Sequence, residues 1–210
     1  MSLTQSDSLF AALHEGGAND ITQAFFRARP RLLNYGSPLF IPATTVAGTS
    51  MPRISFPGVP GGLEWAVRFT VPIVDFHPDS SGGMPPPLTL PPGRFSLRST
   101  VTLWMFCGRR GESVDRVVET SLDLWAVGSL LVRNVDGTST VGFRVDAVEL
   151  AGVLPETLGA FLECMIRMMI NAALAPLNIP LKAMTAGAFT LVLTRGPLIE
   201  TDQVEIWGHL

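Results

Sequence analysis

The sequence is poor in charged and in chemically reactive side chains. Charged residues make up 16% of the 210 residues, below the usual quarter of a soluble chain, and the formal net charge is −3. Proteins that bind nucleic acid normally carry a basic patch or stripe, so this balance argues against nucleic acid as a partner. The two cysteines and three histidines show no metal-ligand spacing. We therefore expect no metal site and no cofactor.

Sequence motifs of catalysis are also missing. There is no G-x-S-x-G nucleophile elbow, no P-loop and no dinucleotide-binding fingerprint. His77 lies between Asp75 and Asp79 and is the best candidate for a metal ligand or for a base with an orienting carboxylate. Zinc needs three or four converging ligands, and no further histidine or cysteine cluster lies near His77. We predict no catalytic residue and no enzyme activity; an enzyme that uses His77 and Asp75 on a hydrophobic substrate is the weakest of three interpretations.

Apolar runs long enough to span a membrane are absent, although the chain is strongly hydrophobic. Hydrophobic residues make up 47% of it and the mean hydropathy is +0.34, yet no uninterrupted apolar run reaches the ~18 residues of a membrane span. The first residues, MSLTQSDS, lack a basic region followed by an apolar run, so we expect no secretory signal and a cytoplasmic location. The apolar surplus predicts either a large core or an internal apolar cavity.

The most apolar stretch, residues 155–174 (PETLGAFLECMIRMMINAAL), has the periodicity of a long helix. Pro155 and Glu156 suit its first turn. Its apolar side chains recur at three- and four-residue steps, at Leu158, Leu162, Met165, Ile166, Met169 and Ala173. This face is widened by Phe161, Met168 and Ile170, which leaves a narrow polar stripe at Glu163, Arg167 and Asn171. A helix that is apolar nearly all round must be covered on most sides, by protein alone or by protein and an apolar ligand.

Alternating apolar and polar residues predict long antiparallel strands before this helix. The first runs from Leu63 to Ile73, and Pro72 marks an edge, a bulge or the end of its pairing. The second covers residues 94–107, where Trp104 and Phe106 make the outward face apolar at its far end. Further strands are expected at residues 114–127, 129–135 and 140–150, with a hairpin turn at 136–137.

The two ends of the chain and its loops complete the pattern. A first helix is expected from Ser6 or Asp7 to about Arg29, interrupted at residues 16–17. Residues 30–62 are turn-rich, with short extended pieces around 39–41 and 53–56, and residues 77–93 form a Pro/Gly-rich loop. Two strands at 188–194 and 203–207, with a turn at 196–197, close an α+β chain.

Residues 141–208 resemble the carboxy-terminal part of a TULIP domain, the superfamily of the bactericidal/permeability-increasing and lipopolysaccharide-binding proteins. The matching features are a strand, a long apolar helix that ends in the turn Ile170-Asn171-Ala172-Ala173-Leu174, an Ile-Pro-Leu step at 179–181 and a closing hairpin. Residues 8–30 are similar to the short opening helix of the family. Secreted members carry a signal peptide and a disulfide, so their absence here indicates a bacterial intracellular type.

The resemblance implies one TULIP-like lipid-binding domain over residues 1–210, with a long, highly curved antiparallel sheet wrapped around the long helix. Lipid or another apolar small molecule would lie in a groove between them, bound or transferred without catalysis. The residues expected to line this groove are Leu158, Phe161, Leu162, Met165, Ile166, Met169, Ile170, Ala173, Phe69, Val71, Leu97, Val101 and Leu103. The alternative is an assembly protein that uses the same fold, without a ligand, to contact a protein partner or form a homo-oligomer. Membrane contact would be transient at most.

Overall fold

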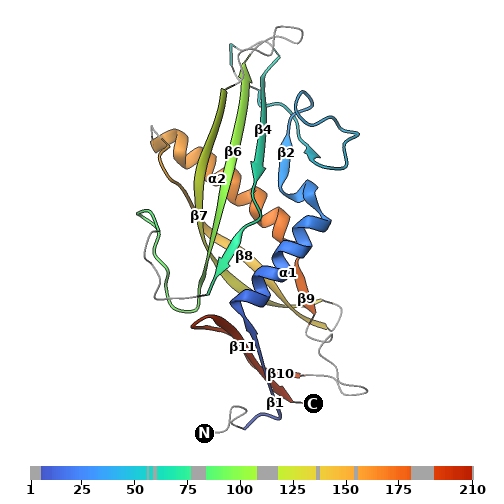
Figure 1. Ribbon diagram of the computed structural model, residues 1–210, viewed down its shortest axis with the longest axis vertical. Coiled ribbons are helices and arrows are strands. Elements are labelled where there is room, and N and C mark those ends of the chain that lie inside the picture. Colours follow the sequence, from blue (N-terminus) through green and yellow to red (C-terminus); the bar gives the residue numbers. More distant parts are fainter. Residues whose placement is uncertain are drawn as a thin grey trace. The chain divides into compact units, whose positions relative to one another are not determined.

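The computed structural model describes residues 6–55, 57–58, 61–76, 84–107, 118–135, 138–153, 156–180 and 192–209 (Figure 1). Contacts divide the chain into two compact units. Unit 1 contains Met1–Ile21, Ile73–Arg98 and Trp125–Leu210, and unit 2 contains Thr22–Pro72 and Ser99–Leu124. The described helices and strands confirm the α+β class. The single TULIP-like domain stays a prediction.

Unit 2 is built on part of a sheet with the strand order β3-β2-β4-β6-β7. Its elements are the second half of α1 (Glu15–Ala28), η1 (Pro30–Leu32), β2 (Asn34–Gly36), β3 (Thr49–Ser50), β4 (Leu63–Phe69) and segments of β6 (Phe95–Cys107) and β7 (Val118–Val135). β3 pairs with β2 in parallel, and β2–β4 and β4–β6 are antiparallel. The buried face of this sheet carries Tyr35, Trp65, Val67, Phe69, Val101 and Leu103, as the period-two pattern predicts.

Unit 1 contains the other segments of β6 and β7 together with β5 (Ile73–Asp75), β8 (Thr138–Leu150) and β9 (Asn178–Pro180). β5 pairs with β6, and β9 pairs with β8 over residues 140–142, both antiparallel. A separate three-stranded sheet has the order β1-β11-β10, from Leu9–His14, Gln203–His209 and Val192–Glu200. It packs through Leu9, Ala11, Leu193 and Ile206 against Leu130 and Val141.

The long helix α2 covers Glu156–Leu174, so the predicted span of 155–174 is confirmed from residue 156 onward. Position 155 lies outside the described part. The helix belongs to unit 1 and packs against β8, as the orange and yellow ribbons of Figure 1 show. Ile166, Met169, Ala173 and Leu174 are buried on it. Within the described ranges, no helix is both long and apolar enough to cross a membrane.

The predicted first helix is wrong over its first half. Residues 9–14 form β1, which pairs with β11 from Leu9↔Gly208 to His14↔Gln203, and α1 starts only at Glu15. Pairing with a strand that lies near the other end of the sequence outweighs the local helical pattern, a common tertiary override of propensity. Residues 16–17, expected to interrupt the helix, therefore belong to its first turn. The buried face of α1 carries Ala18, Thr22 and Phe26.

Three strand boundaries also differ from the predictions. The expected strands at 114–127 and 129–135 form one strand, β7, which runs through Gly128. Gly128 suits a strand interior here because a Cβ would lie 2.5 Å from the Cζ of Phe95 and 2.6 Å from the oxygen of Arg144. The strand expected from Leu63 to Ile73 ends at Phe69, and β5 resumes at Ile73, which is exposed.

The closing hairpin turns at residues 201–202, not at 196–197, because β10 continues through the Gly-Pro pair with shifts in register. Asp202 takes the left-handed conformation at this turn, with φ of 61°. Residues 39–41 form a turn rather than an extended piece, and Ile54 makes an isolated bridge to Leu63. The predicted hairpin turn at 136–137 and most of the first half of the 77–93 loop lie outside the described residues.

Candidate functional site

The polar stripe of α2 is bonded to the backbone of β8. The side chain of Asn171 accepts from Val145 N at 2.8 Å and donates from Nδ2 to Val145 O at 3.0 Å. Arg167 Nη1 donates to Asp146 O at 3.3 Å, and Glu163 Oε1 accepts from Leu150 N at 3.2 Å. These contacts follow the edge of β8 beyond the segment that pairs with β9. Side chains of a helix thus supply the partners that another strand would otherwise give to this edge.

The stripe also brings two carboxyl groups of unit 1 close together. Burial raises the pKa of Glu149 above its ordinary value, and the negative charge of Glu163 raises it further. Arg94 and Arg144 both donate to Asp146, at 2.7 Å each. These two guanidinium groups are therefore paired with a carboxylate three residues before Glu149 in β8. Of the two acidic residues of β8, Asp146 thus has two cations as partners, whereas Glu149 has the negative charge of Glu163 on α2 near it.

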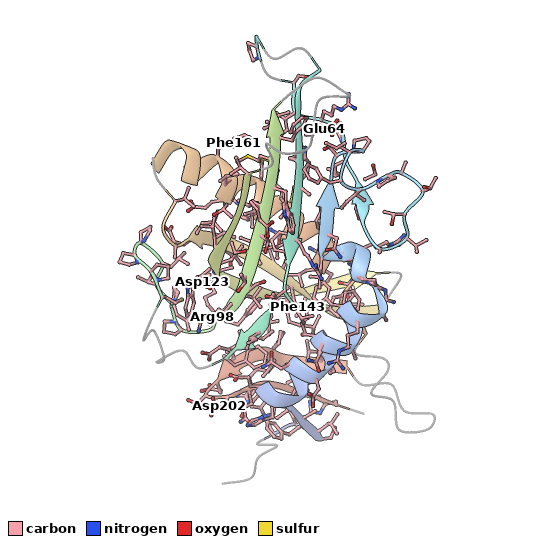
Figure 2. The ribbon with its side chains drawn as sticks, turned by 45° about the horizontal axis from the view of Figure 1, so that its top comes forward. Glu64, Arg98, Asp123, Phe143, Phe161 and Asp202 are labelled. Atoms are coloured by element: carbon pink, nitrogen blue, oxygen red, sulfur yellow. The ribbon has the colours of Figure 1, made fainter. Side chains whose placement is uncertain are left out.

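Anchoring the polar stripe on β8 leaves α2 with two apolar faces. One is buried and contains Ile166, Met169 and Ala173, with exposed fractions of 1%, 8% and 4%. The other, which we name the outer face of α2, contains Phe161, Cys164, Met168 and Ala172 at steps of three, four and four residues. Phe161 is 53% and Met168 60% exposed. Figure 2 labels Phe161 on the ribbon of α2.

The predicted groove residues fall into three groups. Ile166, Met169, Ala173 and Leu97 are buried in unit 1, where Leu162, Met165 and Ile170 are half-buried and Phe161 is exposed. Phe69, Val101 and Leu103 are buried and Val71 is half-buried in unit 2. The side chain of Leu158 lies outside the described part of the chain. A groove shared by all of them stays a prediction.

A pocket that the sequence analysis missed lies entirely within unit 2. Its volume is about 490 Å³ and its lining includes Asn34, Phe40, Ile41, Pro42, Arg68 and Trp104. The strand register pairs Asn34 with Arg68 and Ala66 with Trp104, so these side chains share the sheet face opposite the buried core. The sequence signal that could have indicated this pocket is Trp104, because a large apolar side chain on the outward face of a strand indicates that another segment covers that face.

No metal centre is formed by the described part of the chain, where no three His, Cys, Asp or Glu side chains converge. His77, the predicted candidate, lies outside it, so its role stays untested. Asp75, its proposed partner, is half-buried in β5. His14 accepts from the backbone N of Gly16 at 3.1 Å, a local turn contact at the start of α1.

No protein-family profile and no curated protein sequence match this chain. Among solved structures, the chain is similar to the crystal structure of lipopolysaccharide binding protein, with a TM-score of 0.34 and 16% sequence identity. The alignment covers 96% of this chain and 40% of that one. This chain therefore spans well under half the length of the protein it resembles.

Proposed function

We propose that this protein binds a lipid or another apolar ligand, without catalysis, on the long helix α2. One observation carries the proposal: α2 is fastened to β8 by its polar stripe while its outer face stays uncovered. Phe161 and Met168 are more than half exposed on the same side of the helix. Soluble proteins rarely leave large apolar side chains together at the surface unless the patch binds something.

The attachment of α2 makes this face a stable feature of the helix. Asn171, Arg167 and Glu163 hold the helix over more than two turns, so it cannot roll to bury Phe161 without breaking bonds to β8. Met165 borders the outer face and is half-buried. Methionine is flexible and polarisable, which suits contact with acyl chains of different lengths.

The TULIP-like arrangement belongs to the same proposal. In it, the sheet curves lengthwise around α2, and the acyl chain passes from the outer face over Met165 into the groove. Met165 and Leu162 are half-buried, neither sealed in the core nor fully exposed. Half-buried apolar side chains are expected of a wall that a ligand completes.

The test compares two serine variants of the outer face with a control. Fully burying a phenylalanine or methionine contributes about 1.5–3 kcal/mol, and about half of each side chain is available here. Phe161→Ser and Met168→Ser should therefore each weaken binding of a fluorescent fatty acid about 3- to 10-fold, with unchanged denaturation midpoints. Ile21→Ser, at a side chain 43% exposed on α1, is the matched control and should bind as the parent does.

Protein purified without detergent should also carry apolar ligand in native mass spectra. If the parent carries none and binds neither fatty acid nor phospholipid, the proposal is wrong. A concentration-dependent oligomer that Phe161→Ser dissociates, seen by light scattering, would then assign the outer face to protein assembly, because the same exposed side chains would be covered by a second chain.

A further inference from the structure

The pocket of unit 2 is formed by a loop that is fixed over the outward face of the sheet. Ser37, which is fully buried, donates its backbone N to Trp65 O at 2.8 Å and accepts from Trp65 N at 2.9 Å on its hydroxyl. At the other end, Asn34 Nδ2 donates to Ala47 O at 3.1 Å and Thr49 Oγ1 donates to Arg31 O at 2.9 Å. The loop between these anchors, residues 38–48, therefore has both ends tied to the sheet. A pocket of about 490 Å³ held in this way has the size of preformed small-molecule sites.

Most of the side chains that enclose the pocket are apolar. Phe40, Ile41 and Pro42 come from the loop, and Trp104 comes from β6. Trp104 is half-buried, so part of its indole ring faces the open pocket. A tryptophan face and three apolar neighbours favour a hydrocarbon chain or a flat ring over a sugar or a free inorganic ion.

Arg68 gives this apolar pocket a positive charge. Its side chain is exposed, and among the described residues it forms no ion pair or hydrogen bond. Two other arginines of unit 2 are engaged: Arg53 pairs with Glu64, and Arg29 lies over the ring of Phe25 at 4.5 Å. Arg68 is therefore the cation of the pocket that a ligand can use.

The acidic side chains of this unit that the structure describes leave the charge of Arg68 available. Glu64 lies on the same face of β4 and is labelled in Figure 2, but it is occupied by Arg53 and by the backbone N of Leu39 at 3.4 Å. Glu119 and Asp123 belong to β7, which lies beyond β6 in the strand order. A guanidinium presents two parallel N–H donors that match the oxygens of a carboxylate or of a phosphate. Arg68 is the one cation among the residues that line the pocket, so the singly charged carboxylate suits it better than a doubly charged phosphate.

We infer that this pocket binds a small amphipathic carboxylate, with the acid group on Arg68 and the apolar body against Trp104 and the 40–42 segment. The site differs from the outer face of α2 in its unit, its residues and its charge. It does not depend on the proposed lipid-binding function. Either site can exist without the other.

Three probes with the same hydrocarbon chain isolate the role of charge: octanoate, octanol and octylammonium. Binding is followed by the indole N–H signals of the four tryptophans in two-dimensional NMR, with the Trp104 signal assigned from Trp104→Phe. Octanoate should shift the Trp104 signal saturably. Octanol should bind about tenfold more weakly, because it lacks the charge-assisted bonds, and octylammonium should not bind. Equal binding of octanoate and octanol would overturn the inference, as would the absence of a saturable shift at Trp104.

Substitutions at an exposed side chain then test the assignment of the anion. Arg68→Gln should weaken octanoate about tenfold and leave octanol unchanged, whereas Arg68→Lys should keep part of the preference for the anion. Arg27→Gln removes an exposed cation of α1 in the same unit that does not line the pocket, and should have no effect. An unchanged octanoate affinity in Arg68→Gln would contradict the proposal.

The two sites are separated by crossing their variants. Phe161→Ser and Met168→Ser should leave the octanoate shift at Trp104 intact, and Arg68→Gln should leave binding of long-chain lipid intact. Loss of the Trp104 shift in Phe161→Ser would show that octanoate does not bind in an independent pocket, and would overturn the inference while leaving the lipid proposal standing.

Discussion

Replacing Asn171 by leucine should detach the end of α2 from β8. The change removes two hydrogen bonds, to Val145 N at 2.8 Å and to Val145 O at 3.0 Å, and leaves both backbone groups of a residue that is only 2% exposed without partners. Each unpaired buried group costs roughly 1–3 kcal/mol. Asn171 is itself partly exposed, so water replaces some of the loss, and leucine favours a helix by about half a kcal/mol.

The balance predicts a loss of about 1.5–3 kcal/mol in the free energy of unfolding. For a chain of this size that corresponds to a fall of about 3–12 °C in the melting temperature. The measurement is denaturant unfolding together with amide hydrogen exchange, where the N–H of Val145 should lose protection in particular. Arg167→Leu is the control, because Arg167 makes one longer bond of 3.3 Å from an exposed position, and it should cost less than 1 kcal/mol.

Asn171→Asp tests whether residue 171 must donate a hydrogen bond to Val145 O as well as accept one from Val145 N. The carboxylate can still accept from Val145 N, but it faces the carbonyl oxygen of Val145 with no proton to donate. The charged form is therefore disfavoured in the folded state, which raises the pKa of the new carboxyl above its unfolded value. Stability should fall as pH rises through that folded pKa and recover in acid. If Asn171→Leu unfolds at the same midpoint as the parent, and Val145 exchanges no faster, the bonds to β8 do not hold α2.

Four further substitutions test α2 and the strands β7 and β8. Gly128→Ala should cost about 1–3 kcal/mol, because the new Cβ would lie 2.5 Å from an aromatic ring carbon of β6. Gly159→Ala in α2 should instead stabilise by about 0.5–1 kcal/mol, because its Cβ would have no described atom closer than 3.8 Å. Met169→Ala, at a side chain 8% exposed, should lose about 2–5 kcal/mol in denaturant unfolding, and a loss below 1 kcal/mol would show that the site is not packed. Glu149→Gln should stabilise the protein at neutral pH, because burial and the charge of Glu163 raise the pKa of Glu149 in the folded state. The gain in stability should vanish as the pH falls below 4.5, the ordinary pKa of a glutamate. A gain that persists at lower pH would contradict this prediction.

Local sequence patterns were sufficient to predict β6, β8 and the long helix. β6 and β8 start within two residues of their predicted positions, and both end where predicted. The long helix follows the 3.6-residue period to its last residue, Leu174. In these segments the alternation or the helical period reflects burial along the whole element, so the pattern and the packing agree.

Tertiary contacts decided the elements that the patterns misassigned. Residues 9–14 are compatible with a helix when read alone, and they form a strand because residues 203–209 offer a free edge almost 200 positions away. Gly128 has the appearance of a break between two strands, but the neighbouring Phe95 ring occupies the space where a side chain would stand. Neither fact can be read from residues next to each other in the chain.

The candidate sites divide in the same way. The sequence alone determined that the long helix has a polar stripe at Glu163, Arg167 and Asn171 and apolar residues on both sides of it. A helical period shows which residues share a face, but it cannot show what each face meets. Only the tertiary structure decided that the stripe bonds to the backbone of β8, so that Phe161 remains exposed while Met169 is buried. The pocket around Arg68 and Trp104 likewise depends on strand register and a tied loop, which join residues that are distant in sequence.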